Sequence, residues 1–278
     1  MNKQELLKTA NEVRKGIITG VYNAKSGHPG GSLSAADLYT YLFFEELNID
    51  PADPKKADRD RFVLSKGHTA PGYYAALANR GFFPVKDLET LRHVGSYLQG
   101  HPDMKHIPGV DMSSGSLGQG ISAAVGMAVS AQIYNEDYRV YTLLGDGEIQ
   151  EGQVWEAAML AGFRKLDNLV VIVDNNNLQI DGRIDEVNSP YPIDKKFEAF
   201  NFHVINIDGH NFDEIDAAFK EAKATKGMPT AIIAKTVKGK GVSFMEDQAG
   251  WHGKAPNADE YKIAMEELEK AGEALCQK

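Results

Sequence analysis

Two polar clusters 30 residues apart limit the fold more than any other feature of this chain. LLGDGEIQEG places Asp146 at the end of one apolar run, and VVIVDNNNLQIDG places Asn176 at the end of the next. A strand–helix–strand unit needs about 30 or more residues to bring the chain back parallel to itself. The spacing therefore predicts neighbouring parallel strands whose carboxyl ends carry Asp146 and Asn176 side by side, where open α/β sheets bind their ligands.

The rest of the pattern predicts an α/β fold with a doubly wound, mostly parallel sheet and helices on both faces. Helices are expected over residues 3–25 and 34–46, the second capped by Ser34. A strand at 61–65 leads into a helix that ends at Gly81. The same alternation continues with helix 117–134, strand 140–144, helix 153–163, strand 169–173, strand 202–208, helix 212–224, strand 229–236 and helix 258–275. Residues 82–116 and 183–200 are expected to be loops.

Composition excludes several classes of protein. The 278 residues are 42% hydrophobic and 25% charged, which is typical of a globular protein, and a single domain is expected over residues 1–278. A formal charge of −9 argues against nucleic-acid binding. No apolar run reaches the roughly 20 residues that span a bilayer, and the N-terminus lacks a signal-peptide core. Because Cys276 has no second cysteine to pair with, a cytoplasmic protein is expected.

The residue types at the two strand ends favour a magnesium site. The Asp146 carboxylate, the Asn176 amide and a nearby backbone carbonyl are hard oxygen ligands, and Mg²⁺ completes its shell with water and phosphate oxygens. Gly145 and Gly147 allow the backbone to approach a diphosphate, while a helix beginning soon afterwards would direct free N–H groups at it. The pattern predicts a metal–diphosphate anchor, which Ca²⁺ or Mn²⁺ would also suit.

Six further motifs occur in an order that resembles transketolases. They are SGHPGG at 26–31, LSKGH at 64–68, QGHPD at 99–103, SSGSLGQGIS at 113–122, KGKG at 238–241 and WHGKAP at 251–256. The resemblance implies the thiamine diphosphate-binding fold and, as cofactors, thiamine diphosphate with a divalent ion. Transketolases of full length continue into pyrimidine-binding and C-terminal domains, which this sequence lacks. The chain therefore resembles the N-terminal, diphosphate-binding subunit of a split transketolase.

The resemblance also implies roles for individual residues. The backbone carbonyl of Leu178 would join Asp146 and Asn176 as a metal ligand. The catalytic set would be His28, His68, His101 and His252 around the reactive carbon of the cofactor, with Glu151 at the interface that links two active sites. Cofactor contacts would come from His68, Gly115, Leu117, Gly145, Asp146, Gly147, Glu148, Asn176, Lys238 and His252. The other histidines, His93, His106, His203 and His210, match no motif, and surface or structural roles are expected for them.

The implied reaction transfers a two-carbon ketol unit between sugar phosphates in the pentose phosphate pathway. Xylulose 5-phosphate would be a typical donor and ribose 5-phosphate a typical acceptor. In this family the glutamate that activates the cofactor lies on the pyrimidine-binding domain. The resemblance therefore implies activity only with a companion subunit that carries this domain and the C-terminal domain, most simply as two copies of each chain.

Three alternatives remain open at this stage. A GDG to Asn-Asn unit also occurs in 1-deoxyxylulose 5-phosphate synthase and in the α subunit of 2-oxo acid dehydrogenases, although LSKGH, QGHPD and WHGKAP favour transketolase. A split transketolase could act on an unusual sugar, such as a sulfo- or branched-sugar phosphate. A non-catalytic module that binds a phosphorylated ligand would not require the set of histidines, which argues against it.

Overall fold

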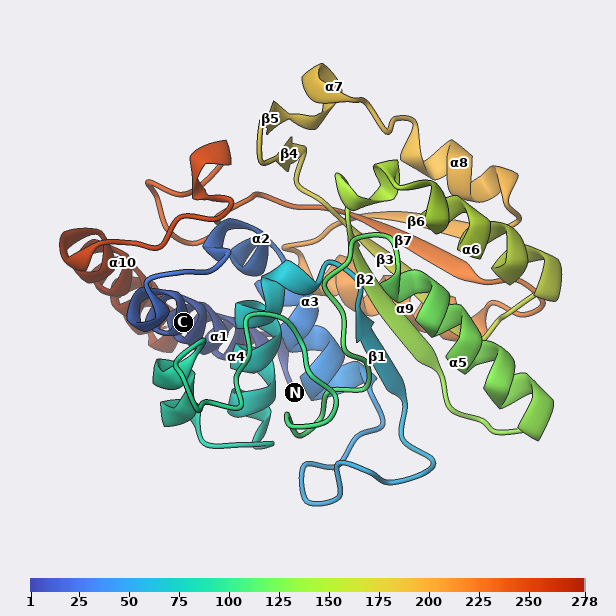
Figure 1. Cartoon of the computed structure of the whole chain (residues 1–278), viewed down its shortest axis with the longest axis horizontal. Coiled ribbons are helices and arrows are strands. Elements are labelled where there is room, and N and C mark those ends of the chain that lie inside the picture. The colour runs from blue at the N-terminus through green and yellow to red at the C-terminus, as the bar shows by residue number, and fades with distance from the viewer. Residues whose placement is uncertain (278) are drawn as a thin grey trace.

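Parallel strands form the centre of the molecule (Figure 1). In the computed structural model, which describes residues 1–277, the strand order is β1-β2-β3-β7-β6, and each neighbouring pair is parallel. The strands are β1 (Arg61–Leu64), β2 (Val140–Gly145), β3 (Leu169–Asn175), β6 (His203–Asp208) and β7 (Thr230–Lys235). A short antiparallel hairpin, β4 (Leu178–Gln179) with β5 (Gly182–Arg183), follows β3. The predicted α/β fold is confirmed.

Strand side chains alternate between two hydrophobic clusters, one on each face of the sheet. In β3, Val170 and Ile172 belong to the first cluster, whereas Val171 and Val173 belong to the second. All four side chains are fully buried. Burial on both faces explains why the strands read as continuous apolar runs in the sequence.

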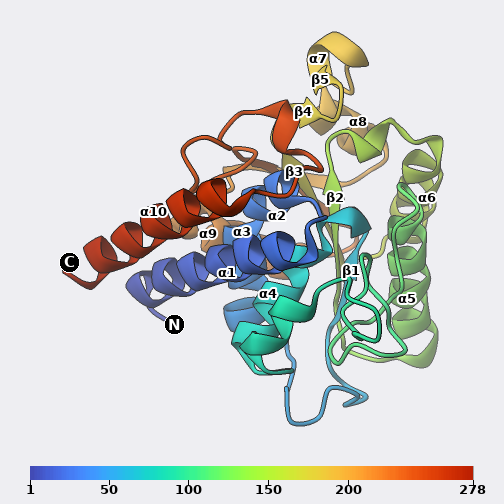
Figure 2. The ribbon, with the colours of Figure 1, turned by 60° about the vertical axis from the view of Figure 1, so that its left-hand side comes forward.

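Helices cover both faces of the sheet. The first face is packed by α1 (Lys3–Ala24), α3 (Ala36–Tyr41), α4 (Ala70–Arg80), α9 (Phe212–Ala224) and α10 (Ala258–Cys276). The second is packed by α5 (Gly120–Tyr134), α6 (Gly152–Arg164) and α8 (Ile193–Ala199). The remaining helical segments are α2 (Pro29–Ser34), α7 (Ile184–Val187), η1 (Leu42–Glu46), η2 (Gly67–Thr69), η3 (Val85–Thr90), η4 (Glu148–Gln150) and η5 (Ala249–Trp251). The terminal helices α1 and α10 lie side by side (Figures 1 and 2).

The expected helix over 34–46 is wrong in its start and in its continuity. The chain forms α2 first, with Pro29 in the first turn, where its missing N–H costs nothing. Ser34 ends α2 and does not cap a helix, because its hydroxyl donates to Gly31 O at 3.1 Å and to Asp174 Oδ2 at 2.6 Å. A new helix, α3, then begins at Ala36 and runs into the π-helical turn η1.

Two other boundaries differ from the sequence-based expectation, and one is confirmed. The helix expected from residue 117 begins at Gly120, since Gly118 has a φ of +80° and belongs to the preceding turn. The expected loop over 183–200 contains α7 and α8, and Ile193 and Phe197 of α8 are buried one helical turn apart. Gly81, with a φ of +100°, ends α4 as predicted.

Within residues 1–277, no helix is both long enough and apolar enough to cross a bilayer.

Candidate functional site

The tips of β2 and β3 lie next to each other, as the 30-residue spacing predicts. Gly145 at the end of β2 pairs in register with Asp174 in β3. Asp146 follows immediately, and its Oδ2 accepts the backbone N–H of Asn177 at 2.6 Å, while its Oδ1 accepts that of Gly147 at 2.9 Å. The acid and the Asn-Asn segment are therefore in direct contact across the strand tips.

A cavity of about 380 Å³ opens at these tips, within the usual size range for a small-molecule site. It brings together segments far apart in the sequence, and all but one of the predicted site residues line it. They are His28, His68, Gly115, Leu117, Gly145, Asp146, Gly147, Glu148, Glu151, Asn176, Leu178, Lys238 and His252.

The exception is His101, an exposed residue outside the cavity lining. Its ring packs against Gly115 so closely that a Cβ at Gly115 would come within 2.8 Å of His101 Cδ2. Gly115 also has a φ of +151°, a conformation that favours glycine. The QGHPD and SSGSLGQG segments therefore fit together through a glycine, and His101 stands one layer from the cavity.

Asp146 is a buried acid without a cationic hydrogen-bond partner among residues 1–277. Only 2% of the residue is exposed, and burial, followed by the nearby charge of Asp174, raises its pKa to about 7. Its two hydrogen bonds come from backbone amides alone. A carboxylate in this position gains stability from any cation that enters the cavity.

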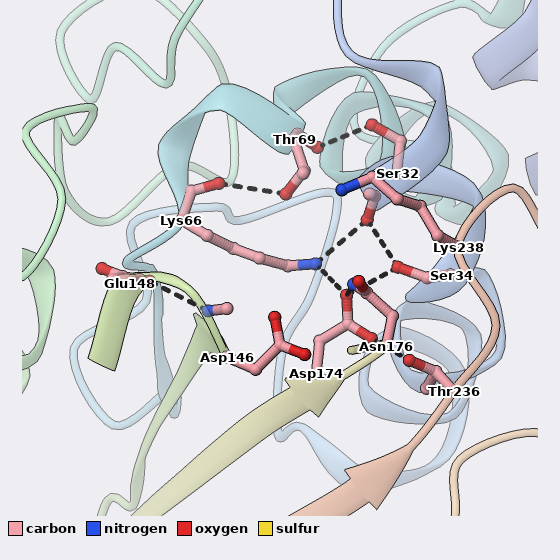
Figure 3. Close-up of polar contacts among 12 residues, drawn as sticks. Ser32, Ser34, Lys66, Thr69, Asp146, Glu148, Asp174, Asn176, Thr236 and Lys238 are labelled. Carbon is pink, nitrogen blue, oxygen red and sulfur yellow. Dashed lines mark hydrogen bonds and ion pairs between the residues drawn. The ribbon is translucent and has the colours of Figure 1, made fainter. Parts of the chain in front are cut away.

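Lys238 supplies a positive charge in the same cavity. Its ammonium donates to Leu178 O at 2.9 Å and lies 3.0 Å from His252 Nδ1 (Figure 3 shows the side chain). The residue is 2% exposed, and burial lowers the pKa of Lys238 to about 8, although the charge of Asp146 opposes this. Lys238 and Asp146 therefore face the same space without a direct ion pair between them.

The donor set fits a divalent ion that is completed by ligand oxygens. Residues 1–277 contain no group of three His, Cys, Asp or Glu side chains that could hold a metal ion by themselves. The cavity wall instead offers one carboxylate from Asp146, one amide oxygen from Asn176 and the backbone carbonyl of Leu178. At Gly147, an added Cβ would meet no protein atom closer than 3.4 Å, so protein packing does not require glycine there. Gly147 lines the cavity, so its backbone can border a bound diphosphate.

Three of the four motif histidines form a cluster at the cavity. The ring centroids are 5.1 Å apart for His28 and His68, 5.4 Å for His28 and His252, and 5.2 Å for His68 and His252. His28 Nδ1 is buried and has no hydrogen-bond partner among residues 1–277. Such an unsatisfied atom is costly to bury and suits a polar ligand.

Burial lowers the pKa of each histidine in this cluster. The pKa of His28 falls to about 4, with Arg92 adding to the effect, and that of His252 falls to about 3, with Lys238 adding to it. Burial and the charge of Lys66 hold the pKa of His68 well below its usual range. All three imidazoles are therefore neutral near pH 7 and can accept or donate a hydrogen bond.

The two glutamates after Asp146 differ in their surroundings. Glu148 is 3% exposed, and its carboxylate accepts hydrogen bonds from Ser65 Oγ at 2.5 Å, Gly118 N at 3.0 Å and Gly145 N at 3.0 Å. It thus ties together three cavity segments. Glu151 is exposed at the cavity rim, where it is the N-cap residue of α6.

Sequence reasoning missed the buried ion pair between Lys66, which lines the cavity, and Asp174 (Figure 3). Burial alone would raise the pKa of Asp174, but the Lys66 ammonium and the hydroxyl donors around it hold that pKa below its ordinary value. A lysine and an aspartate that each end an apolar run, in FVLSK and LVVIVD, were the available signal.

His210, for which a surface or structural role is expected from the sequence, has a structural contact. Its Nε2 accepts the Val237 N–H at 2.9 Å and its Nδ1 bonds Asp37 Oδ2 at 2.7 Å. His210 therefore supports the segment that carries Lys238.

Comparisons with known proteins agree with this geometry. The family model described as "Transketolase, thiamine diphosphate binding domain" matches residues 6–272. The chain is 47% identical over 268 residues to the 6-deoxy-6-sulfo-D-fructose transketolase subunit SqwG of Clostridium sp. strain MSTE9, covering 96% of this chain and 98% of that protein. It is 42% identical over 262 residues to an apulose-4-phosphate transketolase subunit from Phocaeicola vulgatus, covering 94% of this chain and 93% of that protein.

A solved transketolase structure has the same fold as this chain. The crystal structure of transketolase from Campylobacter jejuni matches with a TM-score of 0.90 at 33% identity. The match covers 99% of this chain but 46% of that one. The chain thus spans about half the length of this solved relative.

Proposed function

The chain belongs to the transketolase thiamine diphosphate-binding domain family, and from this premise we propose that it is the diphosphate-holding subunit of a two-chain transketolase. One observation carries the proposal. Asp146, Asn176 and the Leu178 carbonyl line one cavity, and the Lys238 ammonium lies beside them at 2.9 Å from Leu178 O, an arrangement that fits a metal and a diphosphate together.

We assign the cofactor-holding roles to residues of this cavity. Asp146, Asn176 and Leu178 O would hold a divalent ion such as Mg²⁺, and Lys238 would turn its ammonium from Leu178 O to the diphosphate. Bound thiamine diphosphate would supply the electron sink that stabilises a carbanion next to a carbonyl. Gly145 and Gly147 would let the backbone approach the phosphates.

The histidines would act on the sugar. Because His28, His68 and His252 are neutral, each carries one ring N–H and one acceptor nitrogen, and in His252 the acceptor Nδ1 receives the Lys238 ammonium. They would hydrogen-bond substrate hydroxyls and accept or return protons there. His101, one layer away, would reach the donor sugar beyond Gly115, and Glu151 at the rim would contact the partner.

A companion chain would complete the active site. Two relatives of nearly the same length as this chain carry the word "subunit" in their names, which supports a partner with the pyrimidine-binding and C-terminal domains. An assembly of two copies of each chain, in the cytoplasm, is the simplest form of this proposal.

The substrate we propose is an unusual sugar rather than an ordinary pentose phosphate. The two relatives named above act, by their names, on 6-deoxy-6-sulfo-D-fructose and on apulose 4-phosphate. Both cover nearly all of this chain. This favours a sulfo- or branched-sugar donor over the expected xylulose 5-phosphate.

A turnover assay tests the proposal. The chain is purified alone and with the protein that copurifies with it, then supplied with thiamine diphosphate, Mg²⁺, an aldose phosphate acceptor and one donor at a time. The donors are 6-deoxy-6-sulfofructose, apulose 4-phosphate and xylulose 5-phosphate. We expect no turnover by the chain alone and the highest kcat/KM for one of the first two donors in the complex.

Three results would contradict the proposal in different ways. Full activity of the chain alone would reject the two-chain site. A clear preference for xylulose 5-phosphate in the complex would reject the unusual sugar and return the assignment to the pentose phosphate pathway. Absence of turnover with any pyrimidine-domain partner would favour a non-catalytic module.

A further inference from the structure

The carboxylate of Asp174 lies at the centre of a buried polar cluster (Figure 3), of which Lys66 and Asn176 line the cavity. It accepts hydrogen bonds from four different segments. The donors are Lys66 Nζ, Ser34 Oγ at 2.6 Å, Thr236 Oγ1 and Asn176 Nδ2 at 3.1 Å. Each of these partners is a donor, so the site is built for an acceptor.

Lys66 provides the opposite charge for this carboxylate. Its side chain lines the cavity, is 2% exposed and pairs with Asp174 Oδ2, while Nζ also donates to Gly31 O at 3.0 Å. Asp174 is fully buried. A buried ion pair of this kind contributes little net stability compared with an apolar replacement, so its presence invites a second explanation.

Asp174 also controls the orientation of the Asn176 amide, whose Nδ2 it accepts. An amide has a donor end and an acceptor end of nearly the same size, and only its surroundings decide which way it points. A carboxylate accepts only, so it holds the Nδ2 end of Asn176 and turns the oxygen away. That oxygen accepts the Leu178 N–H at 3.1 Å and keeps a second lone pair free at the cavity wall.

We infer that the Lys66–Asp174 pair is a positioning device that fixes the Asn176 amide with its oxygen toward the divalent ion. The inference rests on the proposed function, because it requires a metal in the cavity. With an amide in place of Asp174, only the Leu178 N–H would still favour this orientation of Asn176, and the metal would meet an N–H₂ group in part of the molecules. The Lys66 ammonium is held by Asp174 and Gly31 O, so neither residue would bind the metal directly.

A double-variant cycle tests this inference. Mn²⁺ is titrated into the assembled complex with excess thiamine diphosphate, and free Mn²⁺ is read by electron paramagnetic resonance. The proteins compared are the natural chain, D174N, N176D and D174N/N176D. A carboxylate at 176 offers an oxygen whichever way it turns, so position 174 should then lose its influence.

We expect D174N to weaken Mn²⁺ binding at least tenfold, about 1.4 kcal/mol, when residue 176 is Asn. In the N176D background the same change should cost less than about threefold, because no amide remains to be turned. The matched control is T236V, which removes another hydrogen bond from Asp174 but leaves Asn176 untouched. It should leave the Mn²⁺ affinity unchanged.

Other outcomes overturn the inference. An equal loss in both backgrounds would show that Asp174 acts through its charge or through folding, and no loss would show that it does not position Asn176. If D174N does not fold, K66M/D174N replaces it, because this variant also removes the unpaired ammonium, and the same losses are expected relative to the natural chain and to N176D. Absence of Mn²⁺ binding by the natural complex would overturn the proposed function as well.

Discussion

The tips of β2 and β3 each carry a buried aspartate, yet the two acids have opposite surroundings. Asp174 in β3 is paired with Lys66 and is ringed by hydroxyl and amide donors, and its pKa lies below its ordinary value. Asp146 after β2 receives two backbone N–H bonds and, among residues 1–277, pairs with no cation, and burial raises its pKa to about 7. The protein satisfies one carboxylate internally and leaves the other to be satisfied by a ligand.

The contrast has a physical consequence for stability and binding. A buried charge is costly unless it is paired, so Asp174 needs Lys66 in every state of the protein. Asp146 bears that cost in the ligand-free chain and loses it when a cation binds. The two tips therefore divide the tasks of holding the fold and holding the ligand.

Replacing Lys66 by Met should have the largest effect, because it leaves the Asp174 carboxylate buried without a counter-charge. We expect the free energy of unfolding to fall by about 3–5 kcal/mol, as for other broken buried pairs. Urea denaturation followed by circular dichroism measures this change. The double variant K66M/D174N should recover much of the loss.

The control for this variant is an exposed lysine. Lys220 pairs with Asp216 on α9, and its side chain is 73% exposed. K220M should leave the unfolding midpoint unchanged. A K66M variant as stable as K220M would show that Asp174 does not depend on its ion pair.

Asp146→Ala should abolish metal-dependent cofactor binding while the chain still folds. It removes the charged ligand of the proposed metal site, so the loss should exceed the roughly 100-fold upper range for outer-shell partners of a metal. Isothermal calorimetry of thiamine diphosphate with Mg²⁺ in the assembled complex measures it. The control is D181A, which removes an exposed acid in the neighbouring β4–β5 turn and should leave the cofactor affinity unchanged. Unchanged affinity in D146A would remove the metal assignment.

Metal binding should depend on pH through Asp146, and this is the smallest expected effect. Below pH 7 the carboxyl is protonated, and the metal must displace the proton, so the apparent affinity should fall about tenfold per pH unit. Above pH 7 the Asp146 contribution should be flat. Mn²⁺ titrations at pH 6, 7 and 8 in constant ionic strength measure the slope. Equal affinity at pH 6 and pH 8 would contradict the role of this group.

Through Asp146, folding stability and metal affinity depend on pH in opposite directions. A raised carboxyl pKa in the fold means that Asp146 stabilises the ligand-free chain most below its ordinary pKa and loses that contribution as the pH rises through 7. Lower pH therefore favours the ligand-free fold at this group and disfavours the metal complex.

The sequence predicted those features that depend on local pattern and spacing. The strand ends before Asp146 and Asn176 followed from apolar runs of the right length and separation, and the end of α4 followed from Gly81. The family resemblance predicted most of the cavity-lining residues, because its motifs lie in the loops at the carboxyl ends of the strands.

The features that sequence reasoning missed depend on contacts between distant segments. Ser34 looks like a helix cap in the sequence, but its hydroxyl bonds Asp174, 140 residues away. Lys66 lies 108 residues from the same carboxylate. A local sequence pattern does not indicate which donor contacts which acceptor across a sheet. The buried cluster around Asp174 therefore could not be predicted from the sequence.

The most direct test of the account is a crystal structure of the assembled complex with thiamine diphosphate and Mn²⁺, with the ion located by anomalous scattering. We expect one Mn²⁺ peak at each site, bound by Asp146, the Asn176 side-chain oxygen, the Leu178 carbonyl and diphosphate oxygens. A peak away from Asp146, or a cofactor bound with Asn176 turned from the metal, would contradict it.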